Sequence, residues 1–148
     1  MRQFIALQVA GLLLAACSAP SARGTGDLPP VTGLVATLED ETRPVEAGRL
    51  RWSTYWRLSW TPYPDATGYE LQTVTSEGTS LKLKTLSDPV FRLQVAAGEN
   101  AATLGLHGRQ VQVQMQESQL GFRVRAIMST GRRSGWSDAA AAGRAIGN

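Results

Sequence analysis

The stretch Leu50-Arg51-Trp52-Ser53-Thr54-Tyr55-Trp56-Arg57-Leu58-Ser59-Trp60 decides the predicted fold of this chain of 148 residues. Its large apolar side chains recur at every second position, which is the period of a β-strand with one buried face. The residues that share this face are Leu50, Trp52, Thr54, Trp56, Leu58 and Trp60. The opposite face carries Arg49, Arg51, Tyr55 and Arg57. We therefore expect this strand to present an arginine-rich surface to solvent.

The same period of two continues through most of the chain after residue 30. Apolar and polar residues alternate in residues 69–73, 81–83, 91–95, 111–115 and 120–126, and a weak Ala-rich strand is expected near the end. No segment has the period of a convincing amphipathic helix. We therefore predict an all-β fold, an immunoglobulin-like antiparallel β-sandwich of seven to eight strands, because the apolar face of each strand must be covered by a second sheet.

Two segments in the second half of the chain have unusual composition. Residues 96–102 are small and polar, and we expect them to form a loop. Between residues 110 and 116, four glutamines alternate with two valines and a methionine, which predicts a strand with a solvated glutamine face. The alternatives are that the glutamine face binds a ligand, or that the backbone of this strand pairs with a partner if it lies at a sheet edge.

The composition excludes several classes of function. Hydrophobic residues make up 43% and charged residues 18%, which fits neither a disordered chain nor a bundle of membrane helices. One Cys excludes an internal disulfide and a multi-cysteine zinc site, and one His excludes a His-rich metal centre. A formal net charge of +3 is too small to indicate a nucleic-acid partner. We predict no cofactor and no metal.

The N-terminal sequence predicts attachment to a membrane. Residues 4–16 are apolar except for Gln8 and Gly11, and they are too few for a spanning helix, which needs about 20 residues. They end in Leu14-Ala15-Ala16-Cys17, which resembles the bacterial lipobox of an aliphatic residue, two small residues and a cysteine. The resemblance implies cleavage before Cys17 and acylation of both its thiol and the new amino terminus. The alternatives are a plain secretory signal or a buried cysteine.

The predicted signal peptide and lipidation site divide the chain into four parts. Residues 1–16 are a predicted lipoprotein signal peptide, and residues 17–30 are the lipidated Cys17 and a flexible tether with few apolar side chains. Residues 31–143 form the predicted domain, and residues 144–148 are a tail. We expect a lipoprotein anchored in the cell envelope. Ser18 resembles the residue that sends such proteins to the outer membrane, so this membrane is favoured if the host has one.

The order of short motifs resembles a fibronectin type III domain. Pro29-Pro30-Val31-Thr32-Gly33-Leu34 is similar to the opening strand of that family, and Leu58-Ser59-Trp60-Thr61-Pro62 is similar to the second strand with Trp60 in the core. Gly68-Tyr69-Glu70-Leu71 resembles the third strand. Phe122-Arg123-Val124-Arg125-Ala126 with Ser134-Gly135-Trp136-Ser137 resembles the last hairpin. The resemblance implies a non-catalytic interaction or spacer module that works through loops and sheet faces.

The chain departs from that family at two places. Leu120 stands where the family usually has a tyrosine whose hydroxyl ties the corner between two strands. The stretch from residue 86 to residue 109 is longer than the family needs. The strand register between Leu81 and Gln119 is therefore not defined by the pattern.

Arginines and aromatic residues outside the predicted core are the candidate partner surface. These residues are Arg49, Arg51, Tyr55, Arg57, Arg123, Arg125 and Trp136. In a type III sandwich the two arginine groups belong to opposite sheets, so we expect them to point in opposite directions. Each group is expected to be a solvated face with acidic partners on neighbouring strands, and the alternative is a surface for anionic lipid or lipopolysaccharide.

The aromatic residues support a second hypothesis of a different class. Tyr55 and Trp136 could stack on sugar rings, which would make the chain a glycan-binding module for cell-wall or surface polysaccharide. The alternative is ordinary edge packing. An enzyme is not predicted, because His107 lies in a Gly-flanked turn and the acidic residues are scattered among separate turns.

Overall fold

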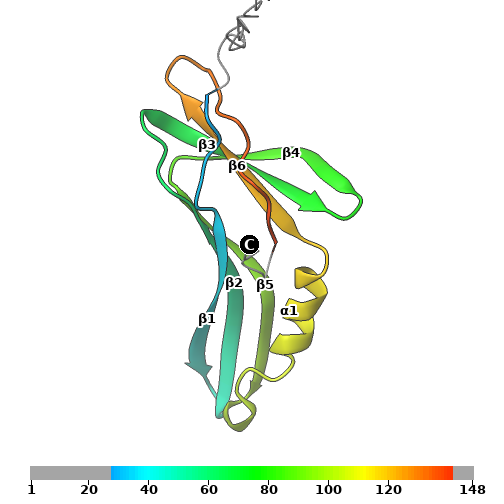
Figure 1. Ribbon diagram of the computed structural model, residues 1–148. Coiled ribbons are helices and arrows are strands. Elements are labelled where there is room, and N and C mark those ends of the chain that lie inside the picture. Colours follow the sequence, from blue (N-terminus) through cyan, green and yellow to red (C-terminus); the bar gives the residue numbers. More distant parts are fainter. Residues whose placement is uncertain (1–27, 142–148) are drawn as a thin grey trace, which may run out of the picture.

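The computed structural model describes residues 28–141, which form a sandwich of two antiparallel sheets (Figure 1). The three-stranded sheet has the order β1-β2-β5, with β1 at Val35–Val45, β2 at Arg49–Ser59 and β5 at Val90–Ala101. The four-stranded sheet has the order β4-β3-β6-β7, with β3 at Ala66–Thr75, β4 at Gly78–Leu86, β6 at Gly121–Met128 and β7 at Ala140–Ala141. A 3-10 helix, η1 at Ala102–Leu104, and a helix, α1 at Arg109–Glu117, connect β5 to β6. The predicted all-β antiparallel sandwich with seven strands is confirmed.

The predicted signal peptide, Cys17 and the tail of residues 144–148 lie outside the described residues. The last residues of the predicted tether are described, and they lie against the domain. Leu28 pairs with Ser134, and the amide of Gly135 donates to the carbonyl oxygen of Leu28 at 2.9 Å. The contacts of the domain therefore begin before Val31.

The core is built on β2, as the alternation predicts. Trp52, Thr54, Trp56 and Leu58 are all at most 2% exposed. The facing sheet covers them with apolar side chains of β3 and β6: Tyr69, Leu71, Phe122, Val124 and Ala126. Burial of each large side chain contributes roughly 1.5–3 kcal/mol to folding, so this face supplies much of the driving force.

The tryptophans of the core are held by shape rather than by polar contacts. Trp60 lies just after β2, and its ring and that of Tyr69 make a T-shaped contact with centroids 5.2 Å apart and an interplanar angle of 72°. The indole N–H groups of Trp52, Trp56 and Trp60 are buried without a hydrogen-bond partner in the described part of the chain. Close packing of the rings against the opposite sheet therefore positions them.

The loop expected at residues 96–102 is wrong, because all but the last of these residues belong to β5. Gly98 lies directly opposite Trp52 in the register of β2 and β5. A Cβ atom on Gly98 would lie 2.6 Å from the Trp52 ring, and the neighbouring Ala96 is 4% exposed. Small residues occur here because the indole ring fills the space above the strand, and not because the chain turns.

The strand expected at residues 111–115 is also wrong, because this segment is helix α1. Val113 is buried, whereas Val111 and Met115 are 62% and 63% exposed. The side-chain amide of Gln112 accepts a hydrogen bond from the Ala97 amide at 3.2 Å and donates to the Ala97 carbonyl oxygen at 3.3 Å. The Gln112 side chain thus satisfies the backbone amide and carbonyl of Ala97 at the edge of β5, which a neighbouring strand would otherwise have paired. Gln, Met and Arg are strong helix formers, so local propensity favours the helix.

The first residue of α1 ties the helix to the inner side of the three-stranded sheet. Arg109 Nε donates to Asp40 Oδ1 at 2.7 Å, and the buried Thr54 hydroxyl donates to the same oxygen at 2.6 Å. Burial by itself raises the pKa of Asp40, but the hydrogen bonds from Arg109 and Thr54 and the charge of Arg109 outweigh it, so the pKa lies below its usual value. The polar side chain of Asp40 therefore occupies a position of β1 on the inner side of the sheet.

This polar contact explains why the sequence pattern misplaced the first strand. The opening strand expected at residues 29–34 is not formed, and β1 begins at Val35. Ala36, Leu38, Asp40 and Thr42 lie opposite the inward residues of β2, but Asp40 and Thr42 are exposed, so this face of β1 is apolar and partly buried only in its first half. Because this face of β1 carries both apolar and polar residues, the sequence lacks the apolar–polar alternation that would identify the strand.

Strand β4 is formed, but its leucines are not covered as the alternation predicts. Leu81 is 98% exposed and Leu83 is 42% exposed. Gln72 pairs with Leu83 and Val74 pairs with Thr79, so three residues of β4 lie opposite one residue of β3. This bulge lies on a hairpin that projects from the sandwich (Figure 1). The leucines therefore face solvent at an edge strand.

Gly98→Ala tests the packing of Trp52 on β5. The added Cβ atom meets the indole ring, so we expect the free energy of unfolding to fall by about 1–3 kcal/mol in a denaturant titration. Ala97→Val adds methyl groups at the adjacent exposed position and should change the free energy of unfolding by less than about 0.5 kcal/mol. A Gly98→Ala protein of unchanged stability would contradict the packing.

Gln112→Ala tests the cover of the β5 edge. Loss of both hydrogen bonds should lower the free energy of unfolding by about 1 kcal/mol and speed hydrogen exchange of the Ala97 amide, which then faces solvent. Gln114→Ala on the exposed side of α1 is the matched control. Equal exchange of the Ala97 amide in both variants and the unchanged chain would refute the contact.

Candidate functional site, an arginine and tryptophan cluster on the four-stranded sheet

The two predicted arginine groups lie on opposite sheets, as expected. Arg49, Arg51 and Arg57 belong to β2 of the three-stranded sheet, whereas Arg123 and Arg125 belong to β6 of the four-stranded sheet. Both groups alternate with buried residues and therefore lie on the outer faces. They form two separate surfaces, and these surfaces differ in how their charge is compensated.

On the three-stranded sheet, each predicted arginine has a carboxylate partner. Arg49 and Arg51 both pair with Glu99 of β5, at 3.0 Å and 2.8 Å, and Arg57 pairs with Glu39 of β1 at 3.5 Å. The hydrogen bond from Arg51 and the nearby positive charges hold the pKa of Glu99 below its usual value. The expected solvated face with acidic partners on neighbouring strands is confirmed here. Exposed pairs of this kind contribute little stability.

Tyr55 lies within the same outer face, but its ring is covered. The guanidinium carbon of Arg92 lies 4.0 Å from the ring centroid of Tyr55. Arg92 is held there by Glu39 at 3.2 Å and by Glu41 at 2.7 Å. A planar ligand would have to displace a doubly paired arginine in order to stack on this face of Tyr55.

On the four-stranded sheet, Trp136 is positioned by a short segment that runs along the edge of β6. Ser134 and Ser137 are buried, and their hydroxyls accept hydrogen bonds from the amides of Ala126 at 2.8 Å and Val124 at 3.0 Å. The amides of the two serines donate to the carbonyls of the same two residues. The segment thus replaces a neighbouring strand and fixes the backbone on both sides of Trp136.

Trp136 meets both arginines of β6. The guanidinium carbons of Arg123 and Arg125 lie 4.7 Å and 4.4 Å from the centroid of its ring. Stacking of guanidinium groups on an indole ring is favourable and leaves the donors at the edge of each guanidinium plane free to bind. We call the group formed by Glu70, Gln72, Arg123, Arg125, Arg133 and Trp136 the arginine–tryptophan cluster.

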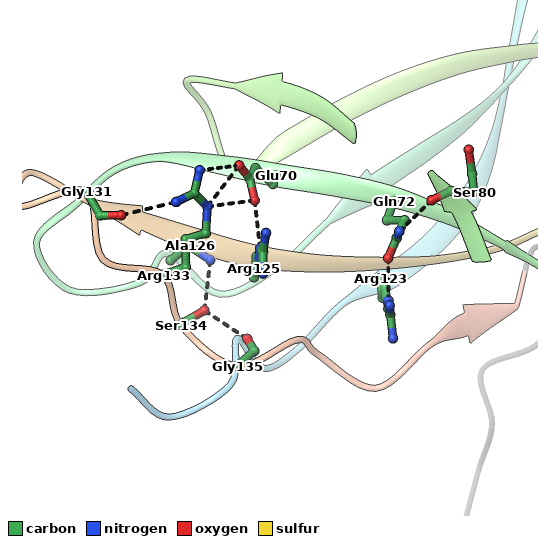
Figure 2. Close-up of polar contacts among 10 residues, drawn as sticks. All are labelled: Glu70, Gln72, Ser80, Arg123, Arg125, Ala126, Gly131, Arg133, Ser134 and Gly135. Carbon is green, nitrogen blue, oxygen red and sulfur yellow. Dashed lines mark hydrogen bonds and ion pairs between the residues drawn. The ribbon is translucent and has the colours of Figure 1, made fainter. Parts of the chain in front are cut away.

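A buried carboxylate on β3 orients one side of the cluster (Figure 2). Glu70 is 6% exposed and accepts a hydrogen bond from Arg125 Nε at 2.7 Å and from Arg133 Nε at 3.0 Å. Burial by itself raises the pKa of Glu70, but the hydrogen bonds and charges of Arg133 and Arg125 outweigh it, so the pKa lies below its usual value. Glu70 therefore stays ionised and neutralises one positive charge.

An uncharged amide orients the other side, as Figure 2 shows. Arg123 Nε donates to Gln72 Oε1 at 2.8 Å, and Gln72 Nε2 donates to the carbonyl oxygen of Ser80 at 2.5 Å. The second bond fixes which end of the amide faces Arg123. Arg123 thus has a fixed orientation without a neutralising charge, in contrast to the three arginines of β2.

The cluster carries excess positive charge. Within residues 28–141, Arg123, Arg125 and Arg133 together have one carboxylate partner, Glu70, so these three positive charges meet a single negative charge. Among the described residues, the terminal nitrogens of Arg123 and Arg125 have no hydrogen-bond partner. These donors can therefore bind an anionic group.

The sequence pattern indicates Arg123, Arg125 and Trp136 as site residues but not Glu70, Gln72 and Arg133. The alternation of Tyr69 and Leu71 could have placed Glu70 and Gln72 on the outer face of β3. The pattern contains no signal for the register that brings Glu70 opposite Arg125 and Gln72 opposite Arg123.

Other candidate chemistry is not assembled in the described part of the chain. His107 is exposed in the turn before α1, where the sequence placed it. Glu99, which was expected in a turn, lies instead in β5. Within residues 28–141, no group of three or more His, Cys, Asp or Glu residues could hold a metal ion. In the same range, no helix is long and apolar enough to cross a membrane.

Comparison of the chain with protein-family models, curated proteins and solved structures gives no match. The candidate site therefore rests on the geometry of the cluster.

Glu70→Gln tests the electrostatics of the cluster. Because the folded pKa of Glu70 is lowered, its ion pairs stabilise the fold above the unfolded pKa of about 4.3, and this stabilisation is lost as the pH falls through the folded pKa. We expect Glu70→Gln to lower the free energy of unfolding by about 2 kcal/mol at pH 7. The difference from the unchanged chain should shrink below about pH 4.

Denaturant titrations from pH 7 to pH 2.5 measure this difference. Glu77→Gln, which changes an exposed carboxylate in the turn between β3 and β4, is the matched control. A loss of stability with Glu70→Gln that is the same at every pH would show that the ion pairs are not its cause.

Proposed function

We propose that this chain is a membrane-anchored envelope lipoprotein whose single fibronectin type III-like domain is a non-catalytic interaction module. The lipobox-like Leu14-Ala15-Ala16-Cys17 supports the anchor. The antiparallel sandwich of a three-stranded and a four-stranded sheet supports the type of domain. The anchor would hold the domain close to the membrane surface, where the outer sheet faces meet other envelope components.

The arginine–tryptophan cluster is the observation that carries the interaction role. The Nε atoms of Arg123 and Arg125 are held by buried acceptors, both guanidinium groups lie over one indole ring, and the acceptor of Arg123 is a neutral amide rather than a carboxylate. Fixing these groups serves no need of the core, which lies on the other side of β6. Rigid side chains lose little conformational entropy on binding, so the cluster is suited to recognition.

The glycan-binding alternative has weaker support. Stacking on a sugar needs an open aromatic face, and arginines cover a face of both Tyr55 and Trp136. The donors that the fold leaves available belong to guanidinium groups, which favour an anionic partner over a neutral sugar.

Cys17→Ala tests the anchor. The variant lacks the thiol that the lipobox requires, so we expect an unprocessed precursor that keeps residues 1–16 and takes up no labelled palmitate. Ser18→Ala keeps Cys17 and is the matched control, which should be labelled and retained like the unchanged chain. Palmitate incorporation into the Cys17→Ala chain would overturn the proposed lipidation.

A further inference from the structure

We infer that Arg123, Arg125 and Trp136 form a recognition site for an acidic, extended segment of a partner protein, with one carboxylate on each guanidinium group. This inference rests on the proposed role as an interaction module and names the chemistry of its partner. It depends on the spacing of the two donors, on the uncompensated charge of Arg123 and on the apolar residues beside them.

The spacing fits alternate side chains of an extended chain. Arg123 and Arg125 are two residues apart on one face of β6, which separates their backbone positions by about 6.6 Å. Residues i and i+2 of an extended partner have the same separation and the same orientation. Each guanidinium can therefore meet the carboxylate of one acidic residue when the partner chain runs along β6.

The orientation of the donors fits carboxylates. Each Nε is already bonded to Gln72 or Glu70, and the guanidinium carbons of Arg123 and Arg125 lie over the Trp136 ring, at 4.7 Å and 4.4 Å from its centroid. What remains is a planar pair of donors at the edge of each group, which matches the two oxygens of a carboxylate. Because these planes are held before binding, the partner does not have to order them.

The charge selects an anionic partner at Arg123 in particular. A carboxylate at position 72 would neutralise this arginine, as Glu70 does for Arg125, but the chain has glutamine there. Gln72 is 9% exposed, so its neutral amide leaves the charge of Arg123 without compensation at the base of the site. An acidic partner supplies the missing charge.

Exposed leucines favour a peptide over a small ion. Leu83 lies opposite Gln72 on the same face of the sheet, and the bulge of β4 projects Leu81, which is 98% exposed. Apolar side chains of a partner can pack there, whereas inorganic phosphate offers no such contact. The surface thus combines a charged half on β6 with an apolar half on β4.

A second copy of this chain fits the surface poorly. Edge strand β4 carries Lys82 and Lys84 and no acidic residue, so antiparallel pairing with a second β4 would bring like charges together. These like charges disfavour the pairing of two β4 edges, and the partner that we infer is a different, acidic chain.

A peptide titration of the purified full-length protein tests the inference. The probe is a capped five-residue peptide of alternating threonine and glutamate, and its counterpart has glutamine in place of glutamate. We expect the acidic peptide to shift the side-chain Nε–Hε signals of Arg123 and Arg125 in NMR spectra, and the glutamine peptide to leave them unchanged. Higher salt should weaken binding, since the contact is between charges.

Single substitutions show which residues contribute to the affinity for the acidic peptide. Arg123→Gln should weaken binding at least about tenfold, and Arg123→Lys should also weaken it, because lysine keeps the charge but has no planar pair of donors. Arg57→Gln makes the same change of charge on the opposite sheet and should leave the affinity within about twofold. Gln72→Glu supplies an internal carboxylate for Arg123 and should reduce binding even though Arg123 is present.

Several outcomes would overturn the inference. Equal weakening by Arg123→Gln and Arg57→Gln would mean that only net charge matters. Unchanged binding in Gln72→Glu would mean that Arg123 is not the anchor. Displacement of the peptide by inorganic phosphate or by phosphatidylglycerol vesicles at a lower concentration than the peptide itself would assign the site to phosphate. Any of these results with normal palmitate labelling would leave the lipoprotein proposal standing.

Discussion

Burial of the tryptophan face of β2 is the constraint on which the rest of the structure depends. Trp52, Trp56 and Leu58 lie between the two sheets and are almost completely removed from solvent. Since a strand directs successive side chains to opposite faces, this burial forces the arginines of β2 outward. It also requires β5 to place Gly98 under the Trp52 ring, so the small residues of β5 and the large residues of β2 form one packing unit.

The sheet edges are handled by different structural features, and these features shape the surface of the molecule. One glutamine of α1 satisfies the edge of β5, and two serines satisfy the edge of β6. The serine segment also places Trp136 over the outer face. The segment that satisfies the backbone of β6 therefore contributes a residue to the candidate site. Edge strand β4 instead has a bulge and two lysines, which discourage pairing with another strand.

The two outer faces show how similar sequence patterns lead to different chemistry. On both faces arginines alternate with buried residues, and on both faces an arginine covers an aromatic ring. The arginines of β2 meet carboxylates, so their charges are largely used within the fold. On the four-stranded sheet the carboxylate of Glu70 is shared by Arg125 and Arg133, and among the described residues Arg123 bonds an amide where the arginines of β2 have a carboxylate. The difference makes the four-stranded sheet the better surface for an anionic partner.

The period of β2 and β6, and with it the all-β class and the outward positions of Arg123 and Arg125, can be read from the amino-acid sequence alone. These are local properties, because backbone geometry alone imposes the alternation of a strand. The pattern misled where packing overrode it: the small residues of β5 indicated a loop, and the alternating glutamines of α1 indicated a strand. Tertiary structure alone decided which arginine is neutralised. Glu70 and Gln72 are more than 50 residues from their arginines in the chain, and only the register of β3 against β6 pairs one with a charge and the other with an amide.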